Sequence, residues 1–430
     1  MPSRLRLNSY LLPVIVVALC IVQLIDPSRV WTVLLVGLGG LWFITFLWAR
    51  GLSRHLSFVR ELRYGWVQVG DALEERFTLD NRSGFSATWV EIEDRSSLPG
   101  YNASLATGVD GHGANQWRKK STCTRRGVYF LGDTLLHTGD PFGIYTVTIR
   151  NSARASLMVM PPVVPLPILD IIPGGFGGDG RPTPNAPEDT IDASTIREYA
   201  PGDSMRLVHW KTTARQGKFF VRLFDGAPAS DWWILLDLQN TAQVGEGENS
   251  TEEHGVILAA SLADRGLGEH LGVGLVINGG RLNWLPPRSG SDQRWEILRM
   301  LALASRGEIP LVDVLEHVQP NLGHNSSLLI ITPTSETDWL PTLPSLYRRG
   351  ITPTVLSLNP GSFGGKWDNR ELMIALEKMG VAHYDIPREV LDRPEATPGT
   401  RGQWEWHVSA TGRAIPIRSP GDLSWRRLSE

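Results

Sequence analysis

The residues best suited to chemistry lie close together in this chain, between positions 197 and 224. This segment reads Arg-Glu-Tyr-Ala-Pro-Gly-Asp-Ser-Met-Arg-Leu-Val-His-Trp-Lys-Thr-Thr-Ala-Arg-Gln-Gly-Lys-Phe-Phe-Val-Arg-Leu-Phe. From Arg197 to Arg222 it holds six Lys or Arg against two acids, although the whole chain carries a formal charge of −3. A local excess of cations could bind a phosphate, a carboxylate or an acidic protein surface.

Turn and capping residues predict that part of this segment is helical. Pro201-Gly202 favours a turn, and Asp203 is a good N-cap residue. Gly217 suits the position just after the last helical residue, because glycine readily adopts the left-handed conformation needed there. We therefore expect a helix of about three turns over residues 204–215.

The expected helix allows two compatible interpretations. In the first, its cations form a docking surface for an anion or an acidic protein, built from Arg206, Lys211 and Arg215. Lys211 and Arg215 would be like charges four residues apart, which favours an anionic partner between them. In the second interpretation, which we favour, the segment is a clamp between domains. Glu198 and Asp203 would neutralise the arginines, and Trp210 would pack into the seam.

A catalytic use of the same residues is an alternative. His209 lies beside Trp210 and Lys211 and could serve as a general base. With Arg206 and Lys211 it could act on a phosphate-bearing or acidic substrate, as in a hydrolase-type enzyme. A packed or hydrogen-bonded histidine is the commoner outcome, and we favour it.

Other catalytic and metal-binding patterns are missing from the sequence. It has no His-Glu-x-x-His, no Cys-x-x-Cys and no Gly-x-Ser-x-Gly, which argues against a zinc site and against a serine hydrolase. The run from Gly361 to Lys366 is close to a phosphate-binding loop, but Pro360 replaces the first glycine and Trp367 follows the lysine, so we expect a turn. The glycine cluster at residues 174–180 lacks the Gly-Lys-Ser/Thr ending, and we expect a flexible segment.

Length and composition limit what can position these residues. The chain has 430 residues, which predicts two or three folded units. Its 42 Lys+Arg and 45 Asp+Glu nearly balance, which argues against a protein drawn to nucleic acid by its bulk charge. Apolar residues at 42% and charged residues at 20% exclude global disorder. Cys20 and Cys123 are too few for a disulfide framework, which indicates a reducing compartment.

Two adjacent apolar runs in the first 63 residues predict a retained transmembrane helical hairpin. The first, Leu11 to Ile25, is interrupted only by Gln23, and the second begins at Val30 and ends at Trp48 without a charge. The second run nearly matches a hydrocarbon core of ~30 Å at ~1.5 Å per residue. Only Arg29 lies in the connecting turn, so the positive-inside rule places both ends in the cytoplasm. The flanking arginines are Arg4, Arg6, Arg50, Arg54, Arg60 and Arg63.

Two further domains follow, joined by a linker. Residues 64–165 alternate in short strand-like runs broken by turns, which predicts an antiparallel β-sandwich of six or seven strands. Residues 166–190 are rich in Pro and Gly and are expected to be a linker. The chemistry-bearing segment then occupies residues 191–225.

Residues 226–393 predict an α/β domain. Strand-like runs lie near 232–238, 272–277, 327–331 and 352–358, and helix-like runs lie near 252–265, 292–305 and 369–379. This alternation predicts a mostly parallel sheet with helices on both faces and a functional edge at the carboxyl ends of its strands. Residues 394–430 form a tail without a clear element.

The segment from Arg197 to Arg215 resembles the hallmark of the bacterial family that carries the domain of unknown function 58. The shared pattern is Arg-Glu-Tyr-x-Pro-Gly-Asp-x-x-Arg-x-x-x-Trp-Lys-x-x-Ala-Arg, and residues 126–132 and 140–143 resemble a second family stretch. The resemblance implies a membrane-anchored, non-enzymatic protein with a β-sandwich and a von Willebrand type A-like domain. It also implies a scaffold or partner role for a MoxR-type AAA+ ATPase. The signature residues are Arg197, Glu198, Tyr199, Pro201, Gly202, Asp203, Arg206, His209, Trp210, Lys211 and Arg215.

The resemblance also implies where a metal would bind. Type A-like domains hold Mg²⁺ through Asp-x-Ser-x-Ser at the end of the first strand, since hard cations prefer oxygen ligands. The matching residues here run from Asp237 to Thr241, but Gln239 replaces the first serine. Thr332 follows a later strand, where the family often has an aspartate. Asp237, Thr241 and Thr332 are therefore candidate Mg²⁺ ligands, but we favour a metal-free strand end that caps the next helix.

The sequence as a whole predicts a multi-pass protein of the cell membrane with cytoplasmic soluble domains. We expect a non-enzymatic scaffold or adaptor for a MoxR-type AAA+ ATPase in protein assembly or maturation, without a cofactor and without a nucleic-acid partner. The hydrolase-type enzyme is the alternative. A third interpretation, a Mg²⁺-dependent adhesion module, would require Asp237 to bind the metal.

Overall fold

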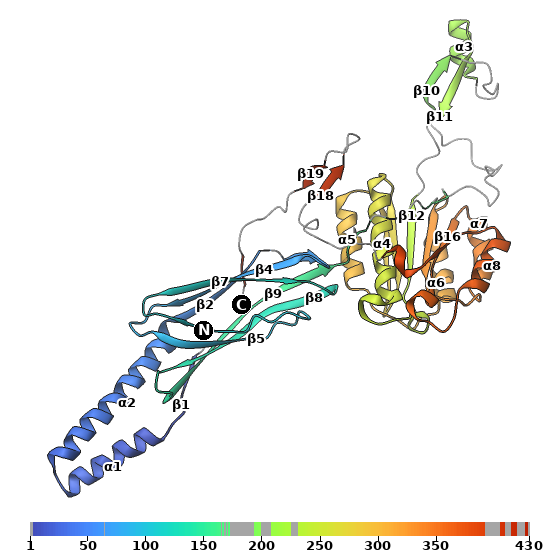
Figure 1. Cartoon of the computed structure of the whole chain (residues 1–430). Coiled ribbons are helices and arrows are strands. Elements are labelled where there is room, and N and C mark those ends of the chain that lie inside the picture. The colour runs from blue at the N-terminus through green and yellow to red at the C-terminus, as the bar shows by residue number, and fades with distance from the viewer. Residues whose placement is uncertain are drawn as a thin grey trace. The chain divides into compact units, whose positions relative to one another are not determined.

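The computed structural model describes most of the chain, which forms two compact units, Met1–Met160 with Pro398–Glu430, and Pro161–Thr397 (Figure 1). The described residues are 3–63, 65–164, 166, 169, 171–172, 193–198, 208–224, 231–391, 405–408, 414–418 and 426–428. For residues 193–198, 221–224, 405–408, 414–418 and 426, only the backbone is described.

The first unit is built on two β-sheets. In one, the strands lie in the order β1 (Ser3–Leu7), β9 (Tyr145–Met160), β8 (Gly127–Gly139), β5 (Ala87–Asp94) and β6 (Leu105–Val109). These pairs are antiparallel, and β3 (Trp66–Gln68) adds to β9 in parallel. The other sheet has the order β20 (Arg426–Arg427), β2 (Leu56–Leu62), β4 (Ala72–Asn81) and β7 (Ala114–Thr122).

The two sheets share one apolar core. In β2, alternate residues are buried, as expected for a strand with one face toward a core. Phe58 of β2 and Phe77 of β4 stack at 6.0 Å between ring centroids, and both belong to the cluster that includes Val90, Leu136 and Val147 of the first sheet. The antiparallel sheets agree with the expected class, but the last part of the predicted β domain forms one long strand, β9, rather than short ones.

A cluster of buried charges crosses the core of this unit. The Arg60 guanidinium donates to both carboxylate oxygens of Glu75 at 2.8 Å and to Asp94 at 2.7 Å. The three side chains are 2%, 0% and 1% exposed. Arg60 also lies over the Phe77 ring, and the Tyr101 hydroxyl donates to Glu75. Each buried charge thus has a partner, as burial of ions requires.

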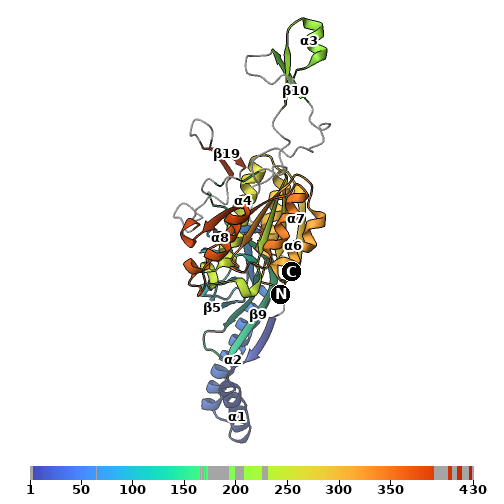
Figure 2. The same cartoon turned by 90° about the vertical axis from the view of Figure 1, so that its right-hand side faces the viewer.

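Two helices extend from this unit as a hairpin. α1 (Leu11–Ile25) and α2 (Arg29–His55) run side by side in both views of the chain (Figures 1 and 2). The first apolar run was predicted with its observed bounds, whereas α2 continues beyond Trp48, where the second run ends. Among the described residues, α2 is long and apolar enough to cross a membrane, a property that it shares with signal sequences, and α1 is shorter.

The last turns of α2 belong to the core of the β-sheets. Ala49 and Leu52 are both fully buried in it. The Trp42 indole donates to the Tyr145 hydroxyl at 2.7 Å, and the Trp48 indole donates to the Ser86 carbonyl at 2.9 Å. Trp48 therefore packs against the folded domain. The predicted membrane-spanning run thus ends at a residue that belongs to the folded domain.

The second unit contains a six-stranded sheet. The order is β14 (Leu282–Arg288), β13 (Val273–Asn278), β12 (Trp232–Asp237), β15 (Ser327–Thr332), β16 (Thr352–Leu358) and β17 (Ala382–Ile386). All pairs are parallel except that between β13 and the edge strand β14. The sheet is thus mostly parallel, as expected, and its inner strands are fully buried. β14 and β17 were not predicted from the sequence.

Helices cover both faces of this sheet (Figure 1). α4 (Thr251–Gly268) and α5 (Ser291–Ala302) lie on one side. α6 (Leu311–Val318), α7 (Leu343–Arg348) and α8 (Arg370–Met379) pack with Trp233, Leu235 and Ile330 on the other side. The helices expected near 252–265, 292–305 and 369–379 correspond to α4, α5 and α8, whereas α6 and α7 were not anticipated.

Two small β-hairpins complete the described chain. β10 (Ala193–Glu198) pairs antiparallel with β11 (Phe220–Phe224), and α3 (Trp210–Gln216) lies between them in sequence. β18 (Glu405–Val408) pairs with β19 (Ala414–Arg418). Part of the expected linker is described and lies against the α/β domain, where the Ile172 carbonyl accepts from the Ser327 hydroxyl at 2.9 Å. The glycine cluster at 174–180 lies outside the described residues.

Candidate functional site

The signature segment forms a short helix whose start differs from the prediction. α3 begins at Trp210 rather than at residue 204, because His209 is its N-cap. The His209 Nδ1 atom accepts from the Thr212 amide at 3.2 Å and lies 2.7 Å from the Thr212 hydroxyl. The predicted end is confirmed, since Gly217 has a φ of 68° in the left-handed region that favours glycine.

Several signature residues cannot be placed in this helix. Tyr199, Pro201, Gly202, Asp203 and Arg206 lie outside the described residues, and the side chains of Arg197 and Glu198 are not described. The backbone of the last two is paired within β10, with Arg197 opposite Val221 and Glu198 opposite Phe220. The clamp contacts predicted for Glu198 and Asp203 therefore lie outside the described side chains.

The described part of the segment presents an exposed cationic and aromatic surface. Trp210 is 63% exposed and contacts the edge of Phe219, with 6.5 Å between ring centroids. The packing of Trp210 into a seam between domains stays a prediction. Lys211 and Arg215 are exposed, and neither forms an ion pair with a described residue. We call Trp210, Lys211, Arg215 and Phe219 the signature surface.

His209 is used structurally in this arrangement. Its Nδ1 atom caps α3 through Thr212, and the backbone amide of His209 donates to the Phe220 carbonyl at 2.8 Å. Among the described residues no carboxylate or second histidine bonds to its ring. No acid in the described part of the chain thus orients the proposed general base, and the hydroxyl within reach of its ring, that of Thr212, belongs to the cap of α3.

The carboxyl ends of three central strands bring a second set of polar residues together. Asp237 ends β12, Asn278 ends β13 and Thr332 ends β15. The Asp237 carboxylate is 1% exposed. One of its oxygens accepts from the Asn278 amide and the Gln239 backbone, both at 3.0 Å, and the other accepts from the Thr332 hydroxyl at 2.7 Å.

This arrangement fits a capped strand end better than a Mg²⁺ site. Both Asp237 oxygens face hydrogen-bond donors, whereas a cation requires lone pairs directed at it. The candidate ligand Thr241 is exposed, and its hydroxyl accepts from the Gln239 side chain at 2.9 Å. The structure thus joins Asp237 to Thr332 but engages Thr241 elsewhere. No cluster of three metal-binding His, Cys, Asp or Glu side chains occurs in the part of the chain that the structure describes.

Burial sets the electrostatics of Asp237. Removal from water raises the pKa of its carboxyl group, and the hydrogen bonds from Thr332, Gln239 and Asn278 oppose that increase. Sequence reasoning identified Asp237 and Thr332 but missed Asn278. Asn278 directly follows the apolar run Val-Gly-Leu-Val-Ile. A polar residue at the end of an apolar strand was the signal that could have identified it.

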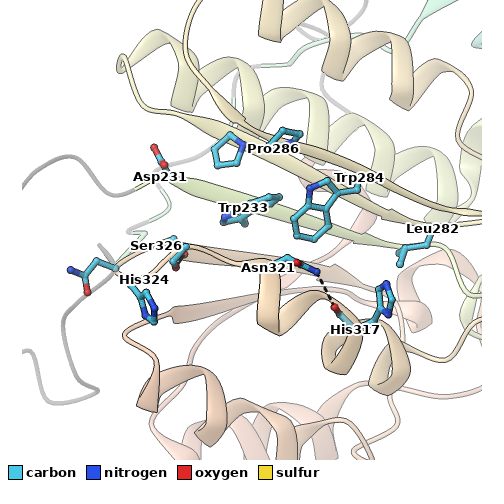
Figure 3. A pocket seen from close by; sticks show the side chains of 12 residues that line it. Asp231, Trp233, Leu282, Trp284, Pro286, His317, Asn321, His324 and Ser326 are labelled. Atoms are coloured by element: carbon cyan, nitrogen blue, oxygen red, sulfur yellow. Dashed lines mark hydrogen bonds between the residues drawn. The ribbon is translucent and has the colours of Figure 1, made fainter.

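A cleft with a volume of about 920 Å³ lies on the same domain near the amino-terminal ends of β12 and β15 (Figure 3). It is bounded by β14 and by the chain from the end of α6 to β15. We call it the aromatic cleft. Its lining residues are Asp231, Trp233, Leu282, Trp284, Pro286, Pro287, His317, Asn321, Gly323, His324, Asn325 and Ser326.

Two tryptophans form the centre of the aromatic cleft. The Trp233 and Trp284 rings lie 4.5 Å apart between centroids and are inclined by 49°, and both are drawn between the polar ends of the cleft in Figure 3. Trp233 is 2% exposed, and its indole Nε1 has no hydrogen-bond partner among the described residues. Such a buried donor is uncommon in proteins. Sequence reasoning missed this cleft because Trp233 lies inside a run that was assigned only to the core.

The fold and these sites define the class of protein. A β-sheet domain with a long apolar hairpin is joined in one chain to an α/β domain with a mostly parallel sheet. Residues 195–345 match the family described as "Protein of unknown function DUF58". The matched range includes the signature surface and four of the six strands of the α/β sheet.

Two curated relatives are described as uncharacterized proteins. The chain is 24% identical over 278 residues to YeaD of Bacillus subtilis, which covers 61% of this chain and 67% of that protein. It is also 24% identical over 173 residues to Rv1480 of Mycobacterium tuberculosis, which covers 38% of this chain and 54% of that protein. The chain thus spans about two thirds of the first relative and about half of the second.

Solved structures show only weak likeness. The CARDB domain of a Pyrococcus furiosus protein shares 12% identity and a TM-score of 0.19, covering 24% of this chain and 89% of that one. Proximal thread matrix protein 1 from the mussel byssus shares 15% identity and a TM-score of 0.27, covering 37% of this chain and 44% of that one. At these scores neither likeness identifies the fold.

Proposed function

We propose that this protein is a membrane-anchored, non-enzymatic platform. In this proposal the α1–α2 hairpin crosses the membrane, and the β-sheet domain and the α/β domain lie on the cytoplasmic side. The observation that carries the proposal is the pairing of β1 with β9, from Ser3 opposite Ile149 to Leu7 opposite Tyr145. β1 precedes the hairpin, and the last turns of α2 are buried in the same domain.

The strand pairing supports two crossings rather than one. Both ends of the hairpin are bound to one folded unit, so both ends lie on the same side of any membrane that α2 crosses. A single crossing by α2 would separate β1 from β9, and the pairing would be lost. In this proposal α1 therefore returns the chain across the bilayer.

The dimensions of the hairpin are compatible with a bilayer. α1 has 15 residues and is about 22 Å long at ~1.5 Å per residue. The part of α2 from Val30 to Leu47 is about 27 Å long by the same rise. Both are slightly shorter than a hydrocarbon core of ~30 Å, a mismatch that local thinning of the bilayer accommodates. Exposed apolar side chains cover both helices, including Val14, Val17, Leu24, Ile25, Val30, Val33, Val36 and Phe43.

Charge supports the cytoplasmic orientation. Arg4 and Arg6 lie on exposed positions of β1, and Arg50 and Arg54 are exposed near the end of α2. The tip of the hairpin carries only Arg29 and the acidic residue Asp26. Positive side chains therefore concentrate at the base of the hairpin, as expected for the cytoplasmic side.

We further infer that the α/β domain is von Willebrand type A-like. Its strand order, with a single antiparallel edge strand beside parallel strands, supports this inference. The position of Asp237 and Thr332 also supports it. They end the neighbouring strands β12 and β15, at the point in the sheet where the strand order reverses. In this proposal the hydrogen bonds of Asp237 take the place of a metal at this strand end.

The proposed partner is a MoxR-type AAA+ ATPase, bound through the signature surface, with Arg206 as a further contact. Exposed Trp210 beside Lys211 and Arg215 is the support for a docking role, because aromatic and cationic side chains are enriched at binding surfaces. The use of His209 as a helix cap speaks against the hydrolase alternative. The client of such a complex would be a protein undergoing assembly or maturation at the membrane.

Cysteine labelling tests the anchoring. In full-length protein with Cys20→Ser and Cys123→Ala, single cysteines would be placed by Ser3→Cys, Ser28→Cys or Ser289→Cys. We expect a membrane-impermeant maleimide to label Ser3→Cys and Ser289→Cys from the cytoplasmic side only, and Ser28→Cys from the opposite side only. Inside-out and right-side-out vesicles distinguish the two. Labelling of Ser3→Cys and Ser28→Cys from the same side would contradict two crossings.

A further inference from the structure

We propose that the aromatic cleft binds a proline-rich peptide of a partner protein, in the polyproline II conformation and with a flanking arginine or lysine. This site lies on the α/β domain and does not depend on the membrane hairpin or on the signature surface. It would supply the platform with a second, peptide-binding contact. The length of the cleft, its aromatic centre and its charge support this proposal.

The cleft has the length of a short extended peptide. Along β14 its lining runs from Leu282 to Pro287, a distance of about 17 Å at ~3.4 Å per residue. About five or six residues of polyproline II span that distance at ~3.1 Å each. Figure 3 shows the lining residues distributed along it, with Leu282 and His317 toward one end and Asp231 and His324 toward the other. An extended ligand suits this shape better than a compact one.

The edge strand beside the cleft disfavours an added β-strand. β14 lies at the edge of the sheet, where a peptide strand could pair with it. Pro286 and Pro287 lack backbone N–H groups, so this part of β14 cannot provide the donors of a β-ladder. A polyproline II peptide needs no such ladder, because its side chains and its carbonyl groups make the contacts.

The tryptophan pair provides the contacts that such a peptide uses. Trp284 is partly exposed and packs on the buried Trp233 ring, with centroids 4.5 Å apart and an inclination of 49°. Trp233 thus holds Trp284 in place, and the Trp284 ring offers the aromatic surface on which a prolyl ring packs.

Charge selects against an anionic ligand and favours a basic one. None of the described residues that line the cleft is Lys or Arg, and Asp231 is their one carboxylate. Asp231 is exposed at the mouth of the cleft, where it could pair with a cation of the peptide. The lining histidines and asparagines add neutral hydrogen-bonding groups.

The negative charge of Asp231 also favours a separate partner over a segment of this chain. The sequence has its own Pro-x-x-Pro, with Pro184 and Pro187. It is followed at once by Glu188 and Asp189, which Asp231 would repel. A basic peptide from another protein complements the cleft better.

Peptide titration of the full-length protein in detergent tests this proposal. The probe is a fluorescent synthetic peptide, Arg-Pro-Leu-Pro-Pro-Leu-Pro-Arg, followed by anisotropy. We expect saturable binding that Trp284→Ala weakens about tenfold or more, as loss of an aromatic contact does. Trp367→Ala is the matched control, because Trp367 is exposed elsewhere on the same domain and should leave binding unchanged.

Further variants separate the contributions to binding. Asp231→Asn, at an exposed position, should weaken the arginine-flanked peptide several-fold but not a version with glutamine in place of arginine. A peptide with alanine in place of proline should not bind. This last comparison and Asp231→Asn keep the test decisive if Trp284→Ala does not fold.

Three results would overturn the proposal. The first is no saturable binding by the wild-type protein, and the second is equal binding of the proline and alanine peptides. The third is a clear gain of affinity in the double variant Pro184→Ala, Pro187→Ala, which would assign the cleft to the chain's own segment. Membrane topology would be unchanged in each case, so this failure is distinguishable from failure of the platform proposal.

Discussion

Replacing Arg60 with methionine should lower the free energy of unfolding of the β-sheet domain by about 3–5 kcal/mol, the cost of breaking a buried ion pair. The variant keeps an apolar chain of similar length over the Phe77 ring but removes the cation that bonds to Glu75 and Asp94. Both carboxylates are almost fully buried. They would either remain ionised without a partner or take up protons, and both outcomes favour the unfolded chain.

Thiol labelling of Cys123 measures this effect within one domain. Cys123 is fully buried in the same core, and burial raises the pKa of its thiol to about 11, so it reacts only when the domain opens. In a Cys20→Ser background, labelling across a urea series reports the local stability. Arg95→Met is the matched control, because its ion pair with Glu93 is about half exposed at 3.0 Å and should be worth less than ~1 kcal/mol. Equal losses for the two variants would contradict the account.

The same cluster predicts a loss of stability in acid. Burial opposes ionisation of Asp94, but Arg60 and hydrogen bonds from Ala103 and Ser96 hold the pKa of this carboxyl below its ordinary 3.8. Its contribution to stability is therefore fully present above pH 3.8 and is lost as the pH falls below that value. Arg60→Met should remove this part of the acid dependence.

The second large effect is expected at the junction between α2 and the β-sheets. Leu52→Ala should destabilise the β-sheet domain by about 2–5 kcal/mol, the range for a large-to-small change in a packed core. Leu52 is fully buried among core residues, although it belongs to the helix proposed to cross the membrane. The prediction follows from treating the end of α2 as part of the folded domain. Urea-dependent labelling of Cys123 is again the measurement.

Leu47→Ala provides the control on the same helix. Leu47 lies between buried Thr45 and Ala49 in sequence but is 39% exposed, on a side of α2 away from the core. Its truncation should change the free energy of unfolding by less than ~1 kcal/mol, as substitutions at surface positions usually do. If Leu47→Ala and Leu52→Ala had equal effects, α2 would not be packed on the domain as described.

The parts of the fold that depend on local pattern could be predicted from the sequence. α1 was found with its observed bounds because an apolar run with Gln23 as its one polar residue ends at Asp26-Pro27. The inner strands of the α/β sheet were found because they are apolar throughout. Strands that form through distant pairing were missed: β1 and β20 are short and have no strong pattern of their own. Their partners lie far away in sequence, in β9 and β2.

The candidate sites were less predictable because they depend on which strand ends meet. Asn278 joins Asp237 only through the neighbouring positions of β12 and β13. The aromatic cleft depends on β14 turning back beside β13, which brings Trp284 against Trp233. At α3, residue type favoured Asp203 as the cap, whereas the observed cap is His209, which residue type alone does not indicate.

Pull-down from native membranes tests the platform claim most directly. The full-length wild-type protein would be compared with the variants Lys211→Glu, Arg215→Glu and Arg206→Glu. Each comparison would be made in the presence and in the absence of ATP. Arg348→Glu is the control, since it reverses an exposed charge at the end of α7. The account predicts that a AAA+ ATPase is recovered with the wild type and the control and is lost with the signature variants. Recovery of no ATPase, or equal recovery with all variants, would contradict it.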